Sequence, residues 1–152
     1  MKTKPDAKRQ LAIRVAKDVL KQIRRGKIVP TRGTYLSSAS PDGNIPRVFR
    51  SATGDMQQVL KKNFPRCKVC GIGAAFLGIV HLENKFDLHD IYDYISDDDM
   101  RARLKQAFGT SEMIALENTF EATSPKSAKD TLIDIMKNII KNEGVFVSTI
   151  YG

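Results

Sequence analysis

The chain has 152 residues, 41% of them apolar, and a formal net charge of +8. This length and composition fit one domain spanning 1–152, with 1–4 outside its ordered part. Its longest apolar stretch, 69–82, is shorter than the ~20 residues that span a bilayer, and no apolar run follows the charged amino terminus. We therefore expect no membrane association and a cytoplasmic location.

The charge is divided unevenly along the chain. Residues 1–68 carry 17 Lys and Arg against four Asp, whereas residues 69–152 carry eight against 13 acids. Such an asymmetry between halves indicates electrostatic partners. The chain has no tryptophan and only 7% aromatic residues, which disfavours platforms that stack on bases.

The first predicted helix covers 5–25. Leu11, Val15, Val19 and Ile23 recur every four residues as an apolar stripe, and Gly26 follows as a stop signal. The polar side of the same helix carries a row of cations that form the predicted basic face: Arg14, Lys17, Lys21, Arg24 and Arg25.

The region 29–51 is rich in Pro, Gly, Ser and Thr and is predicted to be irregular, with a short extended piece at 34–37. Apolar spacing and capping residues then predict helices over 53–63, 67–84, 97–108, 110–120 and 127–142, with a further short one over 87–95. The β-prone tail 145–150 could pair with the extended piece near Tyr35. The fold class is therefore mainly α, a compact assembly of about six helices with a minor β pairing.

The helix over 67–84 is predicted to be central, because it is apolar almost all round. Small residues recur in it at three- and four-residue spacings, as Gly71, Ala74, Ala75 and Gly78, so another helix could approach closely. The same glycines resemble a phosphate-binding loop only superficially, since the spacing differs and no Walker lysine follows.

Cys67 and Cys70 form a CxxC, too closely spaced to frame a disulfide scaffold. With His81 and His89 it suggests a zinc site, but Cys70 and His81 on one helix would lie about 16 Å apart, too far for one ion. We therefore predict no metal ligands and no cofactor. A redox role stays open, since a helix amino terminus beside Arg66 and Lys68 would lower a thiol pKa.

Acids dominate the segment that follows the central helix. Asp90, Asp93, Asp97, Asp98 and Asp99 recur at spacings that form a solvated face and a helix start, with Ser96 as the cap. A two-metal hydrolase could use such a cluster. We predict instead an acidic face for a partner, and no catalytic residues anywhere in the chain.

The basic face could contact phosphates, which require positive charge but little specific spacing. Further cations that could join it are Arg32, Arg47, Arg50, Lys61, Lys62, Arg66 and Lys68. Nucleic acid is therefore a possible partner. Halves of opposite charge would also permit self-association.

The segments 67–76 (CKVCGIGAAF) and 111–121 (SEMIALENTFE), with Asn84 between them, resemble small uncharacterised proteins encoded by bacteriophages and prophages. The resemblance covers most of 8–121 and implies a small cytoplasmic accessory protein that interferes with a host protein or defence system. Our leading hypothesis is thus a non-enzymatic interaction module, an inhibitor or adaptor that acts on a host protein through charged surfaces. The alternatives are a nucleic-acid-binding protein and a thiol-redox or metal protein.

Overall fold

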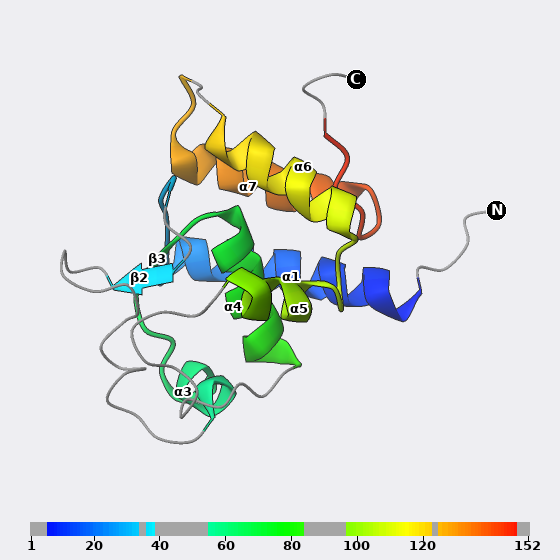
Figure 1. The fold of residues 1–152 in the computed structure, drawn as a ribbon. Helices are drawn as coiled ribbons and strands as arrows, with labels where there is room; N and C mark the ends of the chain where they lie inside the picture. The colour runs from blue at the N-terminus through cyan, green and yellow to red at the C-terminus, as the bar shows by residue number, and fades with distance from the viewer. Residues whose placement is uncertain (1–5, 34–35, 39–54, 84–96, 123–124, 149–152) are drawn as a thin grey trace.

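The computed structural model describes residues 6–33, 36–38, 55–83, 97–122 and 125–148. These residues form a mainly helical assembly with a small three-stranded sheet, which confirms the predicted fold class (Figure 1). The elements in chain order are α1 (Ala7–Arg24), β1 (Ile28–Pro30), β2 (Leu36–Ser38), α3 (Met56–Lys62), β3 (Cys67–Val69), α4 (Gly71–Leu82), α5 (Asp97–Leu104), α6 (Thr110–Glu121) and α7 (Ala128–Lys141).

Helix α4 is the centre of the fold, as its composition predicts. Its residues 71–80 are all buried, and it packs against α1, α3, α5 and α6. Its small residues permit these approaches: a Cβ on Gly78 would lie 2.8 Å from Cγ1 of Val15 in α1, and one on Gly71 would lie 2.7 Å from Cδ2 of Leu116 in α6. The prediction of close helix approach along α4 is confirmed.

Helix α1 follows the predicted stripe. Asp6 caps it by accepting a hydrogen bond from the Arg9 N–H at 2.8 Å, and Gly26 ends it with a φ of +74°. Its buried residues are Ala12, Val15, Ala16, Val19, Gln22 and Ile23, and they face α4 and α7. In Figure 1, α1 (blue) runs behind α4, while α6 and α7 form a layer on the side away from α3.

The sheet corrects two expectations. Strand β3 lies in the middle, parallel to β1 and antiparallel to β2, so that Lys68 is paired with both Val29 and Ser37. Cys67–Val69 is therefore a strand, whereas the sequence predicted the start of the central helix. The region 29–51, predicted to be irregular apart from an extended piece, contributes most of β1 and all of β2; residues 39–54 lie outside the described part.

The tail does not pair as predicted. Residues 145–148 form no strand, and the partner of β2 is β3. Val147 instead exchanges two hydrogen bonds with the side chain of Asn138 in α7, at 2.7 and 2.8 Å. The side-chain amide of Asn138 therefore replaces a strand partner; Tyr35 and residues 149–152 lie outside the described part.

Several helix ends also differ from the prediction. Asp55 is the N-cap of α3 and accepts a hydrogen bond from the Gln57 N–H. Helix α5 ends at Leu104 before a turn. Gly109 precedes α6 and donates its N–H to Glu112 Oε1 at 3.0 Å. Helix α7 begins after Ser127 as predicted, and Gly144 with a φ of +94° follows it. The short helix predicted over 87–95 and the Ser96 cap lie outside the described residues.

Candidate interaction face

The structure exposes all five residues of the basic face. Arg14, Lys17, Lys21, Arg24 and Arg25 lie on the side of α1 away from the core. Arg25 lies eleven positions after Arg14, which gives a row about 16 Å long at the rise of an α-helix. Within the described residues, the one ion pair that any of them makes is between Arg14 and Glu83, the residue that follows α4.

The only acid within α1 is turned away from this row. Asp18 Oδ2 lies 2.8 Å from Nδ1 of His81 in α4, and its side chain is only 9% exposed. The buried Gln22 donates to the other oxygen of Asp18 at 3.2 Å, and the His81 ring packs edge-on against Phe64. The Asp18 carboxylate thus helps to join α1 to α4. No acid of α1 therefore lies among the exposed cations of the basic face. His81, considered above as a zinc ligand, is part of this contact.

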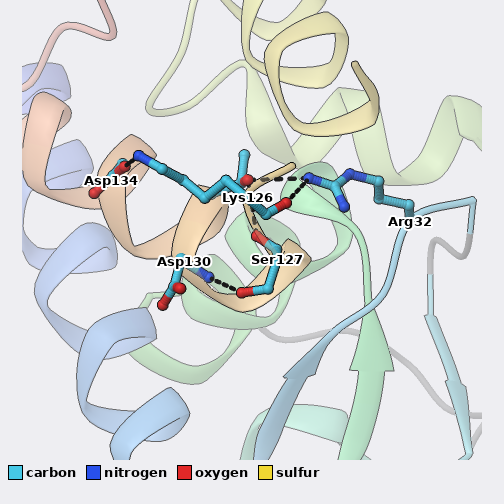
Figure 2. A network of polar contacts seen from close by, with 6 residues as sticks. Arg32, Lys126, Ser127, Asp130 and Asp134 are labelled. Atoms are coloured by element: carbon cyan, nitrogen blue, oxygen red, sulfur yellow. Dashed lines mark hydrogen bonds and ion pairs between the residues drawn. The ribbon is translucent and has the colours of Figure 1, made fainter. Parts of the chain in front are cut away.

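Arg32, one of the further cations that could join the basic face, is engaged in contacts within the fold. Its guanidinium is partly buried and donates three hydrogen bonds, to the carbonyl of Phe120 at 2.9 Å, the carbonyl of Lys126 at 3.1 Å and Oγ1 of Thr131 at 3.0 Å. Figure 2 shows the bond from Arg32 to the Lys126 carbonyl. It also lies 5.8 Å from the centre of the Phe120 ring. Arg32 therefore ties the chain after β1 to the end of α6 and the start of α7.

Neighbouring contacts strengthen the same junction. Figure 2 shows Lys126 paired with Asp134, and Ser127 accepting a hydrogen bond from the Asp130 N–H at 3.1 Å. Gly33 donates its N–H to the carboxylate of Glu121 at 2.8 and 3.0 Å. These contacts hold the Arg32 guanidinium in place at the junction of β1, α6 and α7.

The other predicted members of the basic face lie elsewhere. Lys61 and Lys62 are exposed on α3, which packs on α4, and Arg66 and Lys68 lie at β3. Arg47 and Arg50 fall outside the described residues. The candidate interaction face is therefore α1 itself.

A pocket of about 410 Å³ opens at the amino-terminal end of this row. We call it the α1 pocket; it is lined by Ala7, Lys8, Gln10, Leu11, Arg14, Glu83 and Gln106. It combines two cations with one carboxylate. Sequence reasoning missed it, because Glu83 and Gln106 are brought to α1 only by the packing of α4 and the turn after α5.

The two cysteines differ from the reactive pair that the sequence left open. Cys67 is buried in β3, and Cys70 is buried at the N-cap of α4, where the Gly73 N–H lies 3.5 Å from its sulfur. Burial raises the pKa of Cys67 to about 12 and that of Cys70 to about 11. The expected lowering of a thiol pKa is absent, because the loss of solvent outweighs the helix amino terminus. In the described part of the chain, no three His, Cys, Asp or Glu residues are grouped to hold a metal ion.

Both thiols are expected to react slowly with a disulfide reagent such as dithionitrobenzoate in the folded protein at pH 8. A pKa of about 11 in place of 9.0 lowers the thiolate fraction by about 100-fold, and burial limits access further. The release of thionitrobenzoate, followed by absorbance with and without denaturant, measures this. Reaction of either cysteine at the unfolded rate in the native state would restore the redox hypothesis.

The same pKa shifts predict a loss of stability at high pH. The folded state holds the thiol protons more tightly than the unfolded state, whose thiols ionise near 9.0. The contribution of both cysteines is therefore complete below pH 9 and falls as the pH rises toward 11 and 12.

Two of the five residues of the predicted acidic face lie beyond the described residues. Asp97, Asp98 and Asp99 form the start of α5, and the side chain of Asp98 is exposed. Acids at a helix amino terminus are favoured by the partial positive charge there. Asp90 and Asp93 fall in the undescribed segment 84–96, so the acidic face stays a prediction.

Among the described residues, no helix has the length and apolar character needed to cross a membrane. Comparison with protein families, curated proteins and solved structures finds no match to this chain.

Proposed function

We propose that this protein is a non-enzymatic interaction module that docks an acidic surface of another protein on the basic face of α1. The observation that carries the proposal is the arrangement of α1 itself: five exposed cations lie along one side, and the only acid of the helix is turned inward to His81. Such a one-sided charge speeds encounter with an acidic surface and selects against basic ones.

The mixed charge of the α1 pocket favours a protein partner. Glu83 lies beside Arg14 with 38% of its side chain exposed, so a carboxylate stands within the basic row. It would repel a continuous phosphate backbone, whereas a protein surface that carries both signs can complement it. The resemblance to phage-encoded proteins extends the proposal to a host protein that the module inhibits or adapts.

Nucleic acid is the second candidate, favoured by the row from Lys17 to Arg25. Its four cations form no ion pair within the described part of the chain. The exposed large hydrophobic side chains of the described residues, Ile114 and Val147, lie on α6 and the tail and not on α1. Protein interfaces usually include apolar or aromatic anchors, whereas nucleic-acid interfaces are dominated by positive charge.

Replacing the five residues of the basic face by Gln is expected to weaken binding to a polyanion strongly at low salt. Gln preserves helix propensity, so the variant should keep its fold, which circular dichroism checks. The measurement is fluorescence anisotropy with labelled poly-L-glutamate and with random-sequence DNA and RNA over a range of salt concentrations. If phosphates are bound, the slope of log affinity against log salt should fall by about four to five units.

A matched control removes five positive charges elsewhere. Lys61, Lys62, Arg66, Lys129 and Lys137 are all exposed, so their replacement by Gln gives the same net charge without touching α1. Equal loss in both variants would reject the basic face and leave only an effect of net charge. Stronger binding to nucleic acid than to poly-L-glutamate at physiological salt would favour the second candidate, and no binding to either at low salt would reject both.

A further inference from the structure

The ion pair between Arg14 and Glu83 joins two exposed side chains that both line the α1 pocket. Their exposed fractions are 53% and 38%, and 69 residues of sequence separate them. An ion pair between groups this open to water is weak and exchanges readily for another partner. Glu83 therefore forms an ion pair with Arg14 that another carboxylate can replace.

The position of Glu83 is not explained by the stability of α4. It is the C-cap of that helix, and its N–H donates to the Ile79 carbonyl at 2.8 Å. The carboxyl end of a helix carries a partial negative charge, which disfavours an acid there. Apart from the Arg14 side chain, no contact recorded within the described residues stabilises this carboxylate.

The pocket has the size and chemistry to take a second carboxylate. It is a solvent-open hollow of about 410 Å³. Lys8 adds a second cation to the pocket lining, and an arginine guanidinium can bind a carboxylate through two parallel hydrogen bonds. Glu83 shows by its own position that a carboxylate reaches Arg14 from this side.

We propose that the α1 pocket is the subsite that receives an acidic side chain of the docking partner, and that Glu83 is a tethered competitor for it. In the free protein Glu83 pairs with Arg14; on docking, an aspartate or glutamate of the partner takes its place. The inference rests on the proposed function. It adds that Glu83 lowers the affinity of the basic face for weakly acidic surfaces, because such surfaces must displace it from Arg14.

The test compares four variants by anisotropy with labelled poly-L-glutamate at low salt. Glu83→Gln should tighten binding by about 1.5- to fivefold, the range that one exposed ion pair supplies. Arg14→Gln should weaken binding, and Arg14→Gln combined with Glu83→Gln should bind like Arg14→Gln alone, because Glu83 acts through Arg14. Asp130→Asn is the charge-matched control, since Asp130 is exposed at the start of α7, outside the pocket lining.

The outcomes separate this inference from the proposed function. Equal effects of Glu83→Gln and Asp130→Asn, or a Glu83→Gln gain that persists without Arg14, would overturn the subsite while the basic face still binds. Absence of any poly-L-glutamate binding by the parent would overturn both. A parallel titration with inorganic polyphosphate identifies the occupant, because a larger gain there than with poly-L-glutamate would reject a carboxylate in favour of a phosphate.

Discussion

Gly144→Ala is expected to destabilise the protein by about 3 kcal/mol, which for a domain of this size lowers Tm by about 10 °C. Gly144 follows α7 with a φ of +94°, a conformation that L side chains rarely adopt. An added Cβ would also overlap the backbone of α1, lying 2.8 Å from both the Cα and the carbonyl carbon of Arg9 and closer still to its oxygen. Backbone atoms in a packed helix cannot move aside. Urea unfolding followed by circular dichroism gives the free energy directly.

Gly26→Ala distinguishes the cost of a positive φ from the cost of a steric overlap. Gly26 has a φ of +74°, but nothing lies within 4 Å of a Cβ built there. Its replacement should cost about 1–2 kcal/mol, the penalty of the left-handed conformation alone. If Gly144→Ala costs no more than Gly26→Ala, then the close approach of the α7 turn to Arg9 does not constrain the fold.

Gly78→Ala is the second substitution with a large expected effect, a loss of about 2 kcal/mol. Alanine is the better helix former, so on an exposed helix this change would stabilise. Here the new Cβ would lie 2.8 Å from Cγ1 of Val15, and a β-branched side chain has little freedom to rotate away. Helices α1 and α4 would have to separate, and the free energy of unfolding, measured in urea, should fall.

Two further variants test this explanation. The double variant Val15→Ala, Gly78→Ala should lose less stability than the sum of the losses in the two single variants. Val15→Ala removes the methyl group that the new Cβ at position 78 would meet. Gly71→Ala should cost less than Gly78→Ala, since its nearest neighbour is the terminal Cδ2 of the more flexible Leu116. Additive losses at Val15 and Gly78 would show that the helix contact does not cause the effect.

The helices could be predicted where an apolar pattern repeats over several turns. In α1 and α7 the buried positions recur at the helical period, and a glycine follows the carboxyl end of each helix. The predicted type and approximate bounds of these two elements therefore agree with the structure. The strands could not be predicted in the same way. Each has three residues, too few for an alternating pattern to emerge, and Cys67–Val69 leads directly into an apolar helix.

Only the part of the candidate site that lies on the single helix α1 could be predicted from the sequence. The five cations of the basic face follow from their spacing in α1. The pairing of Arg14 with Glu83 depends on how α4 packs, and no local pattern reports that. Arg32 has the same charge as the face residues, yet its surroundings make it structural. The thiols were misjudged for a similar reason, since burial dominates their pKa and neighbouring charges do not.

The packing of α1 has a consequence for the order in which the molecule can fold during synthesis. The apolar side of α1 is covered by α4 and by α7, which lies more than 100 residues later in the chain. A nascent chain can therefore form α1 early and pack it against α4, but it cannot complete the burial of α1 until α7 has left the ribosome. Until then, the side chains that α7 will cover stay in solvent, where they are open to aggregation or to chaperones. Slow translation between α4 and α7 would lengthen the time for which this part of α1 stays uncovered.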